Sequence, residues 1–287
     1  MPERTTSLMI GAERAASGLS HKTRVVDGET WHYLEGGPAD GEVLLLLHGF
    51  GGDKDNWTRF ARSLTRDYRV IAPDLPGFGE SAKHLDWDYS PLPQRSRLRN
   101  FLLALRLDEV HLVGNSMGGY LAGLYAAEYG DDVSSIAFFN NAGINAPKES
   151  EMERLLAQGT NPLIIDSVDD FDTLLAFVAH KRPFLPWPAK NVFAQKALDH
   201  SELNHIIFDA YESHRDVGLE PLLPDIKQPV LILWGEFDRV LDVSSIEVMR
   251  PLLPQAKVIV MKDTGHIPML ERPGQSAVYY LDFIGQN

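Results

Sequence analysis

The chain has 287 residues, of which 44% are hydrophobic and 23% are charged, and its formal net charge is −13. This length suits one large α/β domain with an insertion, or two small domains. The excess of acidic residues argues against nucleic acid or an anionic membrane surface as the main partner. The absence of cysteine excludes a disulfide framework, a thiolate zinc site and a cysteine nucleophile.

The N-terminal region contains only a short apolar patch at residues 8–10, whereas a signal peptide needs a longer apolar core. The longest aliphatic run, Val43–Leu47, is too short to span a bilayer. Residues 8–19 have the spacing of a weakly amphipathic helix, which we interpret as packed on the protein body rather than on a membrane. We therefore expect a cytoplasmic protein without a stable membrane anchor.

Strands and helices alternate along most of the chain. Residues 22–36 alternate apolar and polar side chains around Asp27-Gly28, which predicts a β-hairpin with a D-G turn. Further apolar runs predict strands at residues 43–47, 68–72, 110–113, 133–139, 230–234 and 256–261. Helical patterns occupy residues 55–66, 91–107, 117–129 and 274–284. This alternation predicts an α/β fold with a mostly parallel sheet flanked by helices, and with the hairpin as an antiparallel edge.

The alternation stops between residues 147 and 224, which are rich in helix formers and large apolar side chains. We interpret residues 147–224 as a helical cap, and residues 1–146 and 225–287 as the two parts of the core. A cap dense in such side chains suits an apolar acyl or aromatic group. The residues that we predict to bind substrate are Phe50, Phe184, Trp187 and Ile267.

A G-x-S-x-G pentapeptide, residues 114–118, follows the predicted strand at 110–113 and opens a helix. This pattern is typical of a nucleophile elbow, in which a serine sits at the apex of a sharp strand-to-helix turn. The glycines on either side leave room for that turn. The sequence therefore predicts Ser116 as a nucleophile.

A serine hydroxyl needs a base, and the base needs an orienting acid. Asp238 follows one predicted strand and His266 follows the next, and catalytic groups of open α/β sheets gather at the carboxyl ends of strands. Asp242, four residues further on, is a rival for the acid. Of the ten histidines, His266 alone follows a strand and lies downstream of the acid. We predict the catalytic residues Ser116, Asp238 and His266.

Acyl transfer also requires donors to the oxyanion that develops on the substrate. The glycine-rich loop at residues 48–52 follows the strand at 43–47 and predicts the backbone N–H of Phe50 as one donor. The second is the backbone N–H of Met117, at the positive end of its helix. We expect the Phe50 ring to line the acyl pocket.

The segment at residues 74–82 contains G-x-G-x-x-A after a strand, a partial match to a dinucleotide fingerprint. Pro76 interrupts the strand-to-helix turn, and no clean helix pattern begins there, so we discount a nucleotide. The expected chemistry needs neither an organic cofactor nor a metal.

Together these motifs resemble those of the α/β-hydrolase superfamily. The matching segments, in the order of that superfamily, are residues 48–52, 74–81, 114–119, 235–238 and 265–266, and the match runs from about Val25 onward. The resemblance implies an α/β-hydrolase fold of the eight-stranded type. Residues 49–57, 132–135 and 141–144 are similar to bacterial lipases and to monoacylglycerol-lipase-like hydrolases. Ser116 disfavours the haloalkane dehalogenase and epoxide hydrolase branches, which have an aspartate at the elbow.

The expected function is hydrolysis of a small-molecule carboxylic ester of short to medium chain length through an acyl-enzyme, with monoacylglycerols among the candidates. One alternative is a serine C–C bond hydrolase of vinylogous diketones, for which Arg182 is a weak candidate carboxylate clamp. A second alternative is a ligand-binding receptor that keeps the triad but turns over slowly. The sequence leaves the natural substrate and the oligomeric state open.

Overall fold

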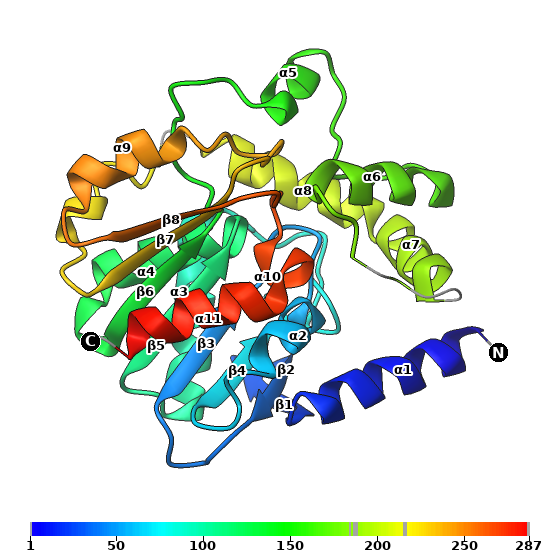
Figure 1. Ribbon diagram of the computed structural model, residues 1–287. Coiled ribbons are helices and arrows are strands. Elements are labelled where there is room, and N and C mark those ends of the chain that lie inside the picture. The colour runs from blue at the N-terminus through cyan, green and yellow to red at the C-terminus, as the bar shows by residue number, and fades with distance from the viewer. Residues whose placement is uncertain (1, 184, 186–188, 215–216, 286–287) are drawn as a thin grey trace.

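A computed structural model describes residues 2–183, 185, 189–214 and 217–285, and these residues form an eight-stranded sheet in the order β1-β2-β4-β3-β5-β6-β7-β8 (Figure 1). The strands are β1 Leu19–Val26, β2 Glu29–Gly36, β3 Val43–Leu47, β4 Arg69–Pro73, β5 Val110–Asn115, β6 Val133–Phe139, β7 Val230–Gly235 and β8 Lys257–Met261. β2 pairs antiparallel with β1 and β4, and all other neighbouring strands are parallel. The mostly parallel sheet with an antiparallel edge is confirmed.

The helices are α1 Pro2–Ala16, α2 Thr58–Ala61, α3 Pro91–Leu105, α4 Met117–Glu128, α5 Glu151–Ala157, α6 Phe171–Val178, α7 Ala189–Asp199, α8 Ser201–Glu212, α9 Ser245–Leu252, α10 Pro268–Glu271 and α11 Pro273–Ile284. Short 3-10 helices are η1 Lys54–Trp57, η2 Gly130–Asp132, η3 Val168–Asp170 and η4 Leu223–Asp225.

The predicted hairpin is present, and its turn explains why the sequence carries Asp-Gly there. Asp27 has φ 54° and Gly28 has φ 85°, and two consecutive positive φ values are those of a type I′ turn. This turn matches the right-handed twist of the flanking strands, so Val26 pairs directly with Glu29.

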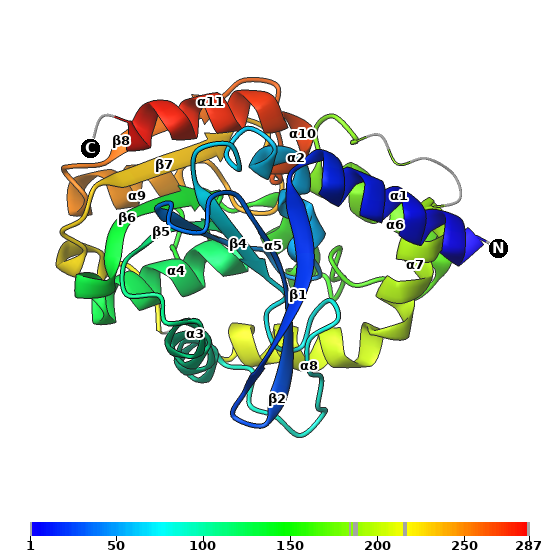
Figure 2. The same cartoon turned by 90° about the horizontal axis from the view of Figure 1, so that it is seen from below.

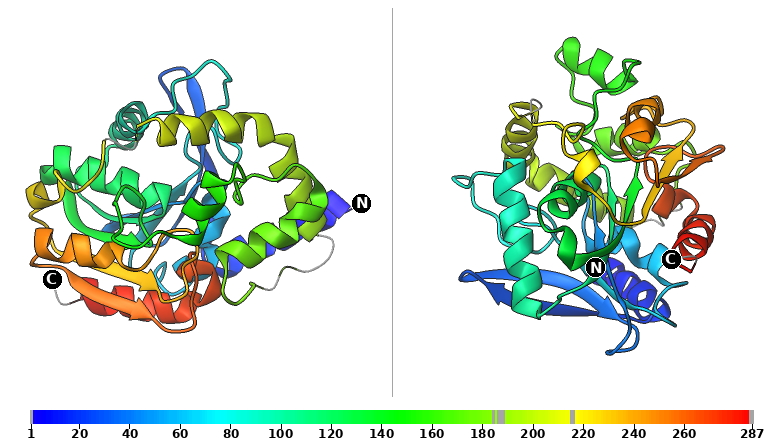
Figure 3. Two further views of the ribbon diagram at one scale, coloured as in Figure 1. Left: turned by 90° about the horizontal axis from the view of Figure 1, so that it is seen from above. Right: turned by 90° about the vertical axis from the view of Figure 1, so that its left-hand side faces the viewer.

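Helices cover both faces of the sheet. Along β3, Leu45 and Leu47 belong to one buried cluster with side chains of α3, α4 and α9, whereas Leu44 and Leu46 belong to another with side chains of α2 and α11. Successive residues of a strand point to opposite faces, so a continuous aliphatic run supplies both cores. Figures 1 and 3 show α3 and α4 on the opposite side of the sheet from α11.

The helices α5–α8, here called the helical segment (residues 151–212), follow β6 and lie outside these two layers (Figure 1). The loops that follow β3, β7 and β8 all contact it. The ring of Phe50 packs edge-on against Phe208 of α8, Arg239 pairs with Glu151 of α5, and His266 N–H donates to the carbonyl of Val178 in α6. The helical segment therefore lies over the carboxyl ends of the parallel strands.

The helix predicted at residues 55–66 is only partly present. The chain instead forms η1, the single turn of α2, and further turns over residues 62–67. The apolar residues whose spacing suggested a single helix are buried by these shorter turns instead: Trp57, Phe60 and Leu64 are all fully buried. The helix α9 was not predicted, although Ile246 and Met249 have helical spacing and are buried.

The N-terminal helix begins and ends earlier than the predicted residues 8–19. α1 spans Pro2–Ala16, and Gly18, with φ 68°, turns the chain into β1 so that Leu19 pairs with Gly36. α1 lies beside α7 of the helical segment (Figure 2). Within the described part of the chain, no helix has the length and apolar character needed to cross a membrane.

Candidate active site

Ser116 lies between the end of β5 and the start of α4, in the conformation expected of a nucleophile elbow. Its φ is 54° and its ψ is −120°, a backbone conformation that side-chain-bearing residues rarely adopt. The neighbouring chain holds it there: Ser116 N–H lies 3.1 Å from the carbonyl oxygens of both Phe139 and Asn140, and Ser116 C=O accepts from Ala142 N–H at 3.0 Å. The side chain is almost fully buried.

Close backbone contacts explain the two glycines of the pentapeptide. A Cβ atom on Gly114 would lie 2.3 Å from the carbonyl oxygen of Gly118, and one on Gly118 would lie 2.3 Å from that of Leu47. Contacts this short exclude any side chain. The glycines thus allow the start of α4 to pack directly against the loop that follows β3.

Asp238 and His266 form a buried pair. His266 Nδ1 lies 2.9 Å from Asp238 Oδ2, and the two side chains are 6% and 0% exposed. A carboxylate only accepts, so Nδ1 carries the proton and Nε2 is left as the acceptor. The rival Asp242 instead accepts from Ser244 N–H.

Asp238 is held by further donors. Its Oδ1 accepts from the backbone N–H groups of Val240 and Leu241 at 2.9 and 3.1 Å, and its Oδ2 accepts from Asn140 Nδ2 at 2.7 Å. These bonds fix the carboxylate plane, which in turn fixes the imidazole of His266.

Asn115 joins the serine turn to the histidine loop. Its side-chain amide, immediately before Ser116, donates to the carbonyls of Phe139 and His266, both at 3.0 Å. The buried amide of Asn115 therefore links the carboxyl ends of β5 and β6 to the loop that follows β8. The elbow and the Asp238–His266 pair lie at the same edge of the sheet.

The loop at residues 48–52 is held by His48. The buried His48 Nδ1 lies 2.8 Å from Gly49 O, and Nε2 accepts from Leu75 N–H at 3.0 Å. Because a carbonyl oxygen only accepts, Nδ1 carries the proton and Nε2 is the acceptor. Burial lowers the pKa of His48, which favours this neutral form. A Cβ atom on Gly49 would lie 3.1 Å from Ser116 Cβ, so this loop runs directly beside the serine.

Of the predicted substrate-binding residues, Phe50 lies on this loop, with its half-buried ring between Phe78 and Phe208. Ile267 is half-buried beside the cluster that contains α11. Phe184 and Trp187 lie outside the described residues.

Three site residues were missed from the sequence: His48, Asn115 and Asn140. Each stands at the carboxyl end of a parallel strand or directly after it. That placement was the available signal, but each residue has a partner far along the chain: Leu75 is 27 residues from His48, His266 is 151 from Asn115 and Asp238 is 98 from Asn140.

The sequence profile of the family described as "alpha/beta hydrolase fold" matches residues 42–273. The chain is 39% identical to lipase 1 of Psychrobacter immobilis, over 97% of this chain and 88% of that protein. It is 32% identical to a monoacylglycerol lipase of Xenopus laevis, over 87% of this chain and 77% of that protein.

Among solved structures, the crystal structure of a membrane phospholipase A, described as a novel bacterial virulence factor, superposes with a TM-score of 0.97. The two are 46% identical, and the match covers 99% of this chain and 92% of the other. The chain therefore belongs to the α/β-hydrolase family.

Proposed function

We propose that this protein hydrolyses carboxylic esters, with Ser116 as nucleophile, His266 as general base and Asp238 as the group that orients the histidine. The observation that carries the proposal is the buried 2.9 Å contact between His266 Nδ1 and Asp238 Oδ2, at the sheet edge where Ser116 occupies its strained turn. The lipases among its relatives agree with this chemistry.

In the proposed mechanism, Ser116 Oγ attacks the ester carbonyl carbon while His266 Nε2 takes the hydroxyl proton. The imidazolium is stabilised by Asp238 and then gives that proton to the leaving alcohol, which leaves Ser116 acylated. Water attacks the acyl-enzyme by the same route and releases the carboxylic acid.

The backbone N–H groups of Phe50 and Met117 are the proposed donors to the oxyanion. Met117 is the first residue of α4, where N–H groups lack partners within the helix. In the described residues, Phe50 N–H takes part in none of the backbone hydrogen bonds outside helices and strands, whereas Gly52 N–H closes the loop onto Gly49 O at 3.1 Å. Two such donors typically lower the barrier by several kcal/mol, about 3 for each.

For the substrate, we propose short- to medium-chain esters, with monoacylglycerols included, bound beneath residues 147–224 acting as a cap. Phe50 joins the oxyanion loop to this cap through its edge-on contact with Phe208, at a ring separation of 5.6 Å. An acyl chain placed at Ser116 would meet this apolar aromatic surface. Phe184, Trp187 and Ile267 are further proposed contacts.

A series of p-nitrophenyl esters of increasing acyl length, together with a monoacylglycerol, tests the proposal. Wild type should give steady-state turnover, and Ser116→Ala should lose it by at least about a thousandfold. Ser96→Ala, on the exposed side of α3, is the matched control and should keep wild-type rates.

Full activity in Ser116→Ala would overturn the proposed nucleophile. Cleavage of a vinylogous diketone without ester turnover would favour the C–C hydrolase. A single stoichiometric burst of product would favour a slow-turnover receptor.

A further inference from the structure

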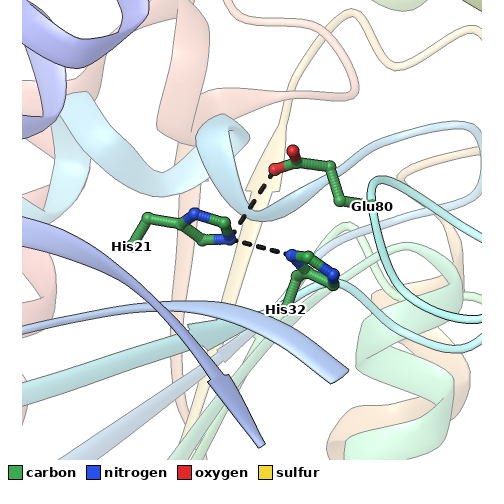
Figure 4. A group of neighbouring side chains, drawn as sticks. All are labelled: His21, His32 and Glu80. Atoms are coloured by element: carbon green, nitrogen blue, oxygen red, sulfur yellow. Dashed lines mark hydrogen bonds and ion pairs between the residues drawn. The ribbon is translucent and has the colours of Figure 1, made fainter. Parts of the chain in front are cut away.

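The hairpin β1–β2 carries two histidines that lie close together on its surface and take no part in the proposed chemistry at Ser116. His21 Nε2 lies 3.0 Å from His32 Nδ1 and 3.7 Å from Glu80 Oε2 (Figure 4). In the described residues, these three side chains form the one group of histidine and acidic ligands whose donor atoms all lie within 4.8 Å of one another.

The strand register explains why the two imidazoles meet. His21 pairs with Leu34, and His32 is two residues before Leu34 on the same strand. His21 and His32 are therefore diagonal neighbours on one face of the hairpin, within reach of each other across the strands. The opposite face carries Trp31 and Tyr33 into the core.

Glu80 comes from the loop that follows β4. That loop is hydrogen-bonded to the hairpin at His32 and at Thr30. Asp74 N–H donates to His32 C=O at 2.8 Å, and Ala82 N–H donates to Thr30 C=O at 3.2 Å. His32 N–H donates to Ser81 Oγ at 2.9 Å. The backbone thus fixes where Glu80 stands relative to the histidines.

A hydrogen bond from Lys54 also orients the Glu80 carboxylate. Its Oε2 accepts from the buried Lys54 Nζ at 2.6 Å, and Lys54 Nζ donates to Asp74 Oδ2 at 2.7 Å as well. Ligating carboxylates in metal sites are commonly hydrogen-bonded in this way. Lys83 Nζ also bonds to this loop, at the carbonyls of Gly79 and Ser81, so the charges of two carboxylates and two ammonium groups balance near the imidazoles.

Two of the three distances between ligand atoms are close to those found around a small transition-metal ion, and all three are within 4.8 Å. Ligand atoms about 2.0–2.1 Å from a tetrahedral Zn²⁺ lie about 3.3 Å from one another, and the two distances from His21 Nε2, 3.0 and 3.7 Å, lie on either side of that value. Two imidazole nitrogens and one carboxylate oxygen are ligands that Zn²⁺ accepts, with water at the fourth position.

We propose that His21, His32 and Glu80 bind one Zn²⁺ ion, which ties the edge hairpin to the loop at residues 74–82. In the free protein, the two imidazole nitrogens lie 3.0 Å apart, so that one N–H donates to the other nitrogen. Zinc binding would replace this hydrogen bond with two metal–nitrogen bonds, and the N–H proton would move to the other nitrogen of its imidazole. His21 and Glu80 are exposed and His32 is partly so, so the ion enters from solvent without a conformational change.

The first experiment titrates the untagged, metal-stripped chain with ZnCl₂ by isothermal titration calorimetry. Wild type should bind one more equivalent of Zn²⁺ than the double variant His21→Gln/His32→Gln. Glu80→Gln, which removes the charged ligand, should weaken this binding by at least about tenfold. Co²⁺ offers a second probe, because its visible absorption reports tetrahedral coordination in wild type and should be lost in the double variant.

His84→Gln is the matched control. His84 Nε2 lies 3.1 Å from Glu29 Oε1, with comparable exposure but as a pair of one histidine and one carboxylate. This variant should keep the extra equivalent, which separates a built site from general binding by surface histidines.

Thermal unfolding gives a readout that does not depend on catalysis. Because a ligand that binds only the folded state stabilises it, excess Zn²⁺ should raise Tm in wild type and in His84→Gln but not in the double variant. Equal stoichiometry and equal Tm shifts in wild type and the double variant would overturn the proposal, as would failure of wild type to bind Zn²⁺.

Discussion

Asn140 Nδ2 donates to Asp238 Oδ2 at 2.7 Å, the same oxygen that receives His266 Nδ1. Asn140 directly follows β6 and has φ 48°, a left-handed conformation that asparagine tolerates better than most residues. Its backbone therefore aims the amide at the carboxylate. We infer that Asn140 is a positioning residue for the proposed triad.

Asn140→Gly should lower kcat for ester hydrolysis by about tenfold while KM stays near wild type, because one hydrogen bond to a buried charge contributes about 1.5 kcal/mol or more. Glycine suits the positive φ, so this variant removes the side-chain contacts without adding backbone strain. Asn140→Ala should lose the same activity and, in addition, about 1 kcal/mol of stability from backbone strain. Steady-state kinetics and urea unfolding of both variants separate these effects, and unchanged kcat in Asn140→Gly would refute the positioning role.

The two neighbouring acids, Asp238 and Asp242, should differ sharply when each is changed to asparagine. Asp238→Asn should lower kcat by about 10⁴-fold, because the amide no longer fixes the His266 tautomer or stabilises its charged form. Asp242→Asn should stay close to wild type, since in the described part of the chain its side chain accepts a hydrogen bond from Ser244 N–H and takes no part in the Asp238–His266 pair. A larger loss of kcat in Asp242→Asn than in Asp238→Asn would show that Asp242, and not Asp238, orients His266.

Much of the fold was predictable because the central strands β3 to β7 are buried on both faces and so appear as largely apolar runs. Val43–Leu47, for example, supplies alternate leucines to the two cores. The positions of Ser116, Asp238 and His266 after β5, β7 and β8 followed from the same pattern, since parallel strands end at one edge of the sheet.

The supporting residues were not predictable, because their roles depend on contacts across long separations. Asn140 and Asp238 are 98 residues apart, and Asn115 and His266 are 151 apart. The Asp-Lys-Asp run at residues 53–55 has the composition of an exposed turn, yet Lys54 is 1% exposed because Asp74 and Glu80 receive its charge. Local sequence does not show that such a charge is paired.

The glycines Gly118 and Gly11 should respond to alanine in opposite ways. In Gly118→Ala the new methyl group would meet the carbonyl oxygens of Leu47 and His48 at 2.3 and 2.5 Å, so we expect a loss of about 3 kcal/mol or more in the free energy of unfolding. Gly11 lies in α1 with no heavy atom within 4 Å of such a methyl group. Gly11→Ala should therefore gain about 0.5–1 kcal/mol from helix propensity. Urea unfolding measures both, and a stable, active Gly118→Ala would show that the close packing is dispensable.

Asp53, which directly follows the loop at residues 48–52, should make the protein less stable as pH rises toward neutrality. Burial, followed by the Asp55 and Asp74 carboxylates, raises the pKa of Asp53 from 3.8 to about 7. Between these two values the folded state binds a proton that the unfolded state has released. The contribution of Asp53 to the free energy of unfolding therefore falls as pH rises from about 4 to 7, and the full cost is present above 7.

Asp53→Asn removes this titration but keeps the cap, because the asparagine oxygen also accepts the Asp55 N–H bond that Asp53 now receives at 2.9 Å. The variant should gain stability relative to wild type progressively between pH 4 and 7, with the largest gain above pH 7. Urea unfolding at several pH values measures this difference. Asp67→Asn, at an exposed carboxylate, is the matched control for removing one carboxylate from the chain. A gain in Asp53→Asn that does not depend on pH would mean that the side chain acts through packing or capping, since only a proton bound more tightly in the folded state produces the predicted slope.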